Sequence, residues 1–146
     1  MPTGWKRLLA TSKISLDSNV LIYAVGRQTD PRARIASEIL RLLPKSDAVL
    51  ALQALAEFAN VTTRKLGLAA PAASEAIAQL ATLAPIVQAD RSTIQKALYL
   101  SERHRLQFWD AMLVATINAA GATVLFSEDM QDDQMIDGVR IVNPFS

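Results

Sequence analysis

Residues 14–23 have the sequence ISLDSNVLIY, in which a short apolar run ends at Asp17 and the polar pair Ser18-Asn19 precedes a second apolar stretch through Val25. A strand, a turn and a helix produce this order of apolar and polar residues. In open parallel sheets, ligands bind beyond the carboxyl ends of the strands. The stretch therefore predicts a strand–turn–helix unit that places Asp17 at a binding edge.

The same alternation continues along the chain. Asp30-Pro31 predicts the start of a helix that ends at Pro44, and an apolar strand within 47–52 leads into a helix over about 53–66. Further expected elements are helices opening at Pro71, Asp90 and about Gln107, and strands at 86–87, 122–126 and 140–142. Short strands alternating with helices of this length predict an α/β fold: one domain with a parallel central sheet of about five strands flanked by helices.

The residue inventory restricts the chemistry. The chain has 146 residues, the length of one domain, with no Cys and one His. Disulfides, thiolate metal sites and a two-histidine nuclease are therefore excluded. The scattered glycines form neither a dinucleotide fingerprint nor a phosphate-binding P-loop, and no G-x-S-x-G elbow is present. Any chemistry must fall mostly to carboxylates.

Charge and hydropathy limit the partners. Fifteen Lys and Arg against 14 Asp and Glu give a net charge of +1, which is not the bulk basicity of a non-specific nucleic-acid binder. Aromatic residues, at 5%, argue against a surface that stacks bases. The longest apolar stretch, residues 111–126, is interrupted by polar residues and is shorter than the ~20 residues of a membrane span. Residues 1–13 lack the apolar run of a signal peptide, so we expect a cytoplasmic protein with no membrane association.

Four acids are candidates for a site. Asp17 and Asp129 follow predicted strands, and Asp110 lies on a helix face with apolar neighbours that would draw its carboxylate inward. Glu57 lies on the helix over about 53–66. Each also has a simpler interpretation: Asp17 as a helix cap, Asp110 as a first-turn acid, and Glu57 and Asp129 as solvated acids. Ser127 could likewise cap a turn.

Together these acids would repel one another and attract a cation. If they converge, two like charges at about 4 Å repel by about 4 kcal/mol at an effective dielectric near 20. Divalent cations make such a cluster tenable, and ligands that are all oxygen suit Mg²⁺ or Mn²⁺. These ions activate water and stabilise the charge that builds on a phosphodiester. Sequence spacing alone does not establish the convergence.

Four stretches in this order resemble the PIN-domain ribonucleases, in particular the VapC toxins of VapBC toxin–antitoxin pairs. The matching stretches are LDSNVLIY at 16–23, AEFANV at 56–61, FWDAMLVA at 108–115 and VLFSED at 124–129, with the ending VNPF at 142–145. Each stretch is weak alone, whereas four in the family's order are specific. The resemblance covers nearly the whole chain from Ile14.

The resemblance implies a metal-dependent endoribonuclease, a hydrolase that cleaves RNA and acts as a toxin. Asp17 and Asp110 match the principal ligands of Mg²⁺ or Mn²⁺, Glu57 the acid that completes the site, Asp129 the fourth acid, and Ser127 a residue that supports metal or substrate binding. The register favours Asp129 over the adjacent Glu128. The resemblance also implies a VapB-like antitoxin partner, a homodimer, a PIN-like domain over 14–146 and an N-terminal extension over 1–13.

A basic rim around the acids would reconcile an RNA substrate with the low net charge. Arg27, Arg32, Arg64 and Lys65 are the candidates for phosphate contact. Two alternatives remain. One is another kind of phosphoryl-transfer enzyme with Asp17 as nucleophile, although Asn19 stands where such enzymes carry a second Asp. The other is a non-catalytic domain that binds protein or RNA.

Overall fold

The computed structural model describes residues 4–26 and 29–146. Its helices are α1 (Trp5–Thr11), α2 (Ser18–Val25), α3 (Pro31–Leu42), a short 3-10 helix η1 (Leu43–Lys45), α4 (Leu52–Arg64), α5 (Ala70–Leu80), α6 (Arg91–His104) and α7 (Phe108–Ala119). Its strands are β1 (Ile14–Leu16), β2 (Leu50–Ala51), β3 (Ile86–Val87), β4 (Val124–Phe126), β5 (Met135–Ile136) and β6 (Val139–Val142). None of these helices is long and apolar enough to cross a membrane.

The strands form a central sheet with an adjoining parallel pair. The four-stranded sheet has the order β1-β4-β6-β5, in which β1, β4 and β6 are parallel and β5 is antiparallel to β6. The parallel pair β2-β3 adjoins β1 through a bridge between Ile14 and Ala48. The predicted α/β class with a parallel central sheet is thus confirmed. The short β5 was not predicted.

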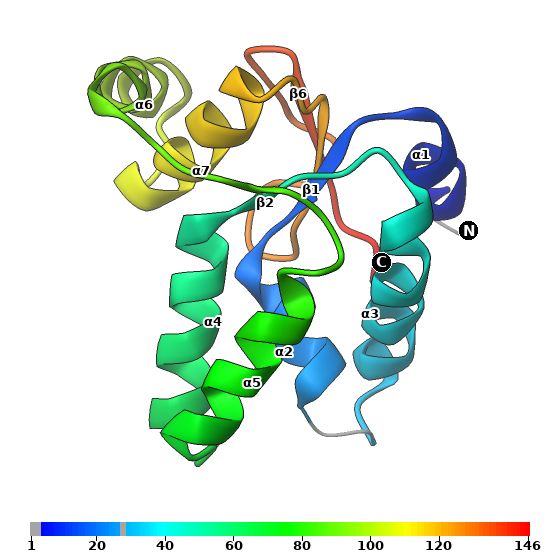
Figure 1. Cartoon of the computed structure of the whole chain (residues 1–146). Helices are drawn as coiled ribbons and strands as arrows, with labels where there is room; N and C mark the ends of the chain where they lie inside the picture. The colour runs from blue at the N-terminus through cyan, green and yellow to red at the C-terminus, as the bar shows by residue number, and fades with distance from the viewer. Residues whose placement is uncertain (1–3, 27–28) are drawn as a thin grey trace.

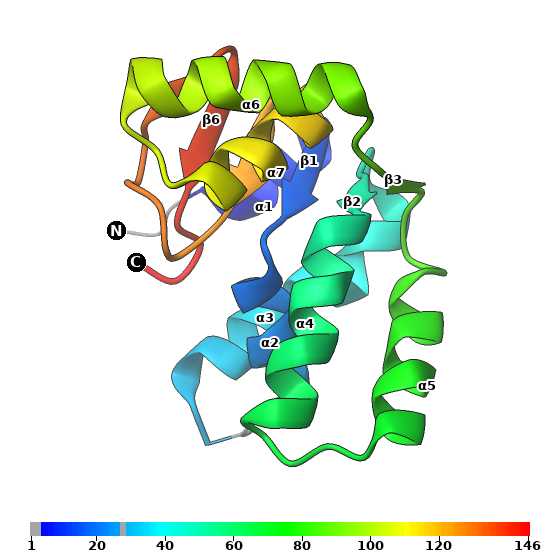
Figure 2. The ribbon, with the colours of Figure 1, turned by 90° about the vertical axis from the view of Figure 1, so that its left-hand side faces the viewer.

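Helices cover both faces of the sheet (Figure 1). Along β4, Val124 and Phe126 pack into one core cluster and Leu125 into the other, as expected for a strand whose side chains alternate between faces. The first cluster contains apolar residues of α1 to α4, and the second is built largely from α6 and α7. Figure 2 shows α6 lying along α7, while α4 and α5 run side by side on the other part of the molecule. Burial on both faces makes the strands near-continuously apolar.

Residues 5–11 form a helix that the sequence analysis did not predict. Trp5 and Leu9 of α1 lie four residues apart, are 9% and 3% exposed, and belong to the first core cluster. Side chains at this spacing share one face of a helix. Residues 5–11 of the expected N-terminal extension therefore pack into the same core as residues from Ile14 onward.

The strand register positions the acids. Leu16 of β1 pairs with Phe126 of β4, so the residues that follow, Asp17 and Ser127, are neighbours at the carboxyl edge. The backbone N–H of Asp17 donates to the carbonyl of Phe126 at 2.9 Å, and that of Ser127 to Val142 at 3.0 Å. Both side chains are consequently held by the sheet rather than by a free loop.

Candidate active site

Asp17 is the most buried acid of the site. It is the N-cap of α2, and its Oδ1 accepts a 2.7 Å hydrogen bond from the backbone N–H of Ser18. Its side chain is 5% exposed, and this burial raises the pKa of the carboxyl from 3.8 to about 6. Hydrogen bonds from Ser127 and Ser18 oppose the rise, whereas the charges of Glu57 and Asp110 add to it. The helix-cap interpretation is therefore correct, yet the cap also lies beside two other acids.

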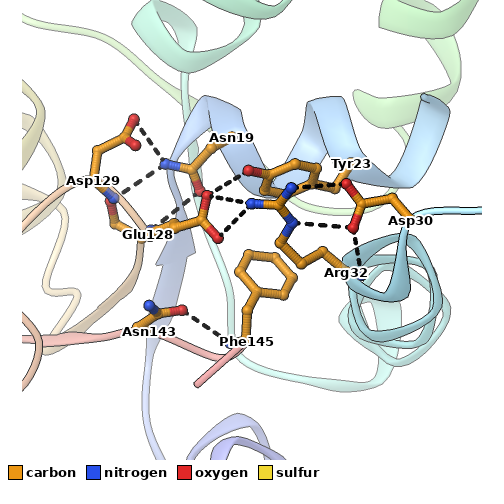
Figure 3. Close-up of polar contacts among 9 residues, drawn as sticks. Asn19, Tyr23, Asp30, Arg32, Glu128, Asp129, Asn143 and Phe145 are labelled. Atoms are coloured by element: carbon orange, nitrogen blue, oxygen red, sulfur yellow. Dashed lines mark hydrogen bonds and ion pairs between the residues drawn. The ribbon is translucent and has the colours of Figure 1, made fainter. Parts of the chain in front are cut away.

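Ser127 and Asn19 link the ends of β1 and β4. The hydroxyl of Ser127 donates to Asp17 Oδ2 at 2.7 Å and accepts from the backbone N–H of Asp129 at 3.2 Å. The amide of Asn19 donates to Asp129 Oδ2 at 3.2 Å and accepts from the backbone N–H of Glu128 at 3.3 Å. Figure 3 shows Asn19 facing the loop that carries Glu128 and Asp129. Both residues are buried, so this part of the edge is fixed in place.

Glu57 reaches the site from α4. Its Oε2 accepts from the hydroxyl of Ser18 at 3.3 Å, and its Oε1 accepts from the Gln53 amide at 2.9 Å. The same Gln53 amide donates to the backbone carbonyl of Trp109 at 2.8 Å. Gln53 and Glu57 are one helical turn apart and so share a face. Gln53 therefore ties Glu57 to the first turn of α7.

Asp110 lies in that first turn of α7 and is half-buried. The residues from Ala111 to Ile117 that follow it are all buried, which fixes the helix that carries this carboxylate. Desolvation raises the pKa of Asp110, and the charges of Asp129 and Glu57 raise it further. Asp110 is thus a first-turn acid, as the simpler interpretation held, and it also shares the electrostatic field of the other acids.

The two acids after β4 point in opposite directions. Asp129 is exposed, accepts from Asn19 and interacts with Asp110. Glu128 instead accepts hydrogen bonds from Arg32 and Tyr23 on the α2–α3 side (Figure 3). This geometry agrees with the preference for Asp129 over Glu128 that the register indicated.

The structure thus brings together Asp17, Glu57, Asp110 and Asp129 from four different elements. The charges of Glu57 and Asp110 both act on Asp17, and those of Glu57 and Asp129 both act on Asp110. In this conformation the carboxylates bond to Ser18, Asn19, Gln53 and Ser127, and within residues 4–26 and 29–146 no three His, Cys, Asp or Glu side chains converge as metal ligands. The four acids nevertheless offer only oxygen donors, and Asp17 is poorly solvated, which is the donor chemistry that a hard divalent cation prefers.

A hollow of about 460 Å³ opens beside Glu57 and Asp110. Its other lining residues are Gln53, Ala56, Asn60, Gln107 and Trp109. A neighbouring hollow of about 370 Å³ shares Gln53, Ala56 and Trp109 with it. The Trp109 side chain is 56% exposed and stands between the two, so an aromatic face lies next to the acids. The surface carries amide and aromatic groups suited to a nucleotide.

The expected basic rim is only partly visible. Arg64 and Lys65 are exposed at the carboxyl end of α4, seven and eight residues beyond Glu57. At the rise of an α-helix, Arg64 lies about 10 Å from Glu57 along the axis. Arg32 bonds to Asp30 and Glu128, so its guanidinium is engaged with carboxylates rather than free for phosphate. Arg27 lies outside the described residues.

Three polar residues that contact the acids were not singled out as site residues from the sequence: Ser18, Asn19 and Gln53. Ser18 and Asn19 directly follow Asp17 in the first turn of α2, where polar side chains interrupt two apolar runs. Gln53 precedes Glu57 by one helical turn. Their positions near an acid were the available signal, but the partners of Ser18 and Asn19 depend on how α2 packs against α4 and the end of β4, and the contact of Gln53 with Trp109 depends on how α4 packs against α7.

Residues 14–134 match the family model described as PIN domain, so the chain belongs to the PIN domain family. No curated protein sequence matches it.

Solved structures share the fold. One is VapC20 of Mycobacterium tuberculosis, described as a sarcin-ricin loop cleaving toxin, with 22% identity, a TM-score of 0.64, and coverage of 80% of this chain and 89% of that chain. A toxin–antitoxin complex from Klebsiella pneumoniae gives 20% identity, a TM-score of 0.67, and coverage of 90% and 97%. VapBC-1 from nontypeable Haemophilus influenzae has 16% identity and a TM-score of 0.65, and the match covers 92% of this chain and 99% of that chain. The similarity covers most of both chains in each pair.

Proposed function

We propose that this chain is a metal-dependent endoribonuclease that acts as the toxin of a toxin–antitoxin pair. The observation that carries the proposal is the gathering of Asp17, Glu57, Asp110 and Asp129 around the carboxyl ends of β1 and β4. Membership of the PIN domain family and the fold shared with VapC toxins support the same activity.

Mg²⁺ or Mn²⁺ would be held by Asp17 and Asp110, with Glu57 and Asp129 completing the site directly or through water. A buried Asp17 without a cationic partner is costly as an anion, and a cation removes that cost. Glu57 and Asp129, which accept hydrogen bonds from Ser18 and Asn19, would be the further oxygen donors available to the cation. Ser127 keeps Asp17 oriented, as groups behind a metal ligand commonly do.

The reaction is hydrolysis of an RNA phosphodiester. When bound, the cation supplies a more acidic water and stabilises charge on the phosphate. Glu57 and Asp129 would orient the attacking water and accept its proton. Trp109 offers a face on which a base can stack, and the amides of Gln53, Asn60 and Gln107 line the same hollow. Arg64 and Lys65 would contact a phosphate farther along the strand.

A small antitoxin protein is the proposed partner. The similar structures from Klebsiella pneumoniae and Haemophilus influenzae are toxin–antitoxin assemblies, which supports such a partner. We propose that it inhibits the chain by covering this hollow. We further propose that the chain forms a homodimer and acts in the cytoplasm on its RNA.

The purified protein tests the activity directly. It should cleave structured RNA with Mg²⁺ or Mn²⁺, stop on addition of EDTA, and resume when the metal is restored. Co-expression with the small protein encoded by the neighbouring reading frame should relieve growth arrest caused by the chain. An acyl-phosphate trapped on Asp17 would instead favour a phosphoryl-transfer enzyme, and calorimetry without any metal binding would favour a non-catalytic domain.

A further inference from the structure

Glu128 is held away from the acids by side chains of α2 and α3. Arg32 Nη1 donates to both carboxylate oxygens, at 3.2 Å to Oε1 and 3.1 Å to Oε2, and the hydroxyl of Tyr23 also donates to Oε1. Figure 3 shows the Glu128 carboxylate, Arg32 and Tyr23 together, on the side of the loop opposite to Asp129. A carboxylate with this many donors to one side has a defined direction.

Arg32 is itself fixed in place. Its Nε and Nη2 donate to the two oxygens of Asp30 at 3.0 and 2.8 Å, and its guanidinium lies 4.3 Å from the centre of the Tyr23 ring. Asp30 is the N-cap of α3, where it accepts from the backbone N–H of Arg32 at 3.0 Å. A planar guanidinium bound at two edges and one face cannot turn freely. The guanidinium of Arg32 is therefore held in one orientation beside the loop that carries Glu128.

The neighbouring Asp129 is turned the other way. Its carboxylate accepts from Asn19 at 3.2 Å and acts on Asp110. Glu128 and Asp129 are adjacent on one loop, and both carry a carboxylate that an oxygen-preferring cation would accept. Something other than chemical type must decide which of the two faces the other acids.

We propose that Arg32, with Tyr23, is a positioning residue that acts through Glu128 to direct Asp129 toward Asp110. This inference rests on the proposed function, because it assigns a role around the same metal. The charge of Arg32 neutralises Glu128, so the loop adds one uncompensated acid to the site instead of two. In this role Arg32 binds the carboxylates of Asp30 and Glu128 instead of the RNA phosphate that the sequence led us to expect.

The test compares Arg32→Gln, Glu128→Gln and the double variant with Arg34→Gln, an exposed arginine on the same helix. Mn²⁺ affinity is measured by calorimetry and RNA cleavage in parallel, with melting curves to confirm folding. Arg32→Gln should weaken Mn²⁺ binding by about 10- to 100-fold, the range for groups behind metal ligands, and Arg32→Lys should recover part of it. Arg34→Gln should match the parent protein. In the Glu128→Gln background, Arg32→Gln should have much less effect, because its target has lost its charge.

Three outcomes would overturn the inference. In the first, Arg32→Gln binds Mn²⁺ and cleaves RNA as Arg34→Gln does, so that Arg32 is only structural. In the second, Arg32→Gln has the same effect whether or not Glu128 is present, so that it does not act through Glu128. If the parent protein binds Mn²⁺ and cleaves RNA in either case, the proposed function stands and only this inference fails. In the third, the parent protein binds no Mn²⁺, and both fail.

Discussion

The hydroxyl of Ser127 donates a 2.7 Å hydrogen bond to the carboxylate of Asp17, joining two residues that are 110 positions apart in the sequence. Ser127 is fully buried and Asp17 almost so, and their strands pair directly. A donor to a carboxylate favours its charged form. Ser127 therefore keeps Asp17 more acidic than burial alone would.

Replacing Ser127 by Ala should shift the pH dependence of metal binding. Asp17 must lose its proton to bind a cation, so affinity should rise as the pH passes the Asp17 pKa, about 6 in the parent protein. Without the Ser127 donor that pKa rises, and the midpoint moves to higher pH. Mn²⁺ calorimetry from pH 5 to pH 8 measures it. Ser46→Ala, which removes a hydroxyl bond to the Leu43 carbonyl, is the control, and equal midpoints for Ser127→Ala and this control would contradict the prediction.

The buried carboxyl of Asp17 should cost the metal-free protein stability as the pH rises from about 4 to about 6. The folded-state pKa of Asp17 is raised, so the unfolded chain ionises first and folding favours the protonated acid. The cost is fully present above the folded pKa and amounts to about 3 kcal/mol, an order-of-magnitude figure from the shift between 3.8 and about 6. Asp17→Asn should therefore raise the free energy of unfolding at pH 8, by about 1–3 kcal/mol, and little at pH 4.

Urea denaturation in EDTA measures this difference. Asp47→Asn, at an exposed acid outside the four site acids, is the control. A destabilised Asp17→Asn at pH 8 would mean that its hydrogen bonds to Ser18 and Ser127 outweigh the cost of the buried charge.

Trp109→Ala should weaken RNA binding with little change in the turnover rate. Base stacking on an aromatic side chain contributes about 1–3 kcal/mol, which corresponds to roughly 5- to 150-fold in KM. Trp109→Phe should retain most of the affinity. Tyr99→Ala, at an exposed aromatic residue of α6, is the matched control. Steady-state cleavage kinetics separate KM from the turnover rate. An unchanged KM for Trp109→Ala would show that Trp109 does not stack on a base of the RNA.

The acids at the strand ends could be predicted because few arrangements place an acid directly after an apolar strand. The edge positions of Asp17 and of the cluster Ser127-Glu128-Asp129 follow from that pattern, and the inward face of Asp110 from its apolar neighbours, whereas the choice of Asp129 within the cluster came from the family resemblance. Their partners could not be predicted in the same way. Whether Ser18 reaches Glu57, or Gln53 reaches Trp109, depends on the rotation of one helix against another, which hydrophobic periodicity does not determine.

Two elements were missed for different reasons. The β5–β6 hairpin turns at Asp137-Gly138, whose φ angles are 49° and 84°. An Asp-Gly pair is a known signal for a hairpin, but the pattern of strands alternating with helices predicts only parallel strands. Helix α1 buries only Trp5 and Leu9, too few apolar positions for a clear periodic pattern.

Composition does not show where single side chains lie. An aromatic share of 5% argues against a surface that stacks bases, whereas Trp109 is exposed and lines the hollow beside Glu57 and Asp110, so its stacking role stays a proposal. A single side chain at the right place does not register in an average over the chain.

The rate of RNA cleavage by Asp110→Asn in Mn²⁺ tests the proposed site most directly. Asp137→Asn, in the β5–β6 turn and paired with Lys96 away from the four acids, is the control. We predict metal-dependent cleavage by the parent and by Asp137→Asn, and a loss of about 100-fold or more for Asp110→Asn, because removing one ligand forfeits several kcal/mol of charge stabilisation. Cleavage by Asp110→Asn at the parental rate, or parental cleavage that persists in EDTA, would contradict it.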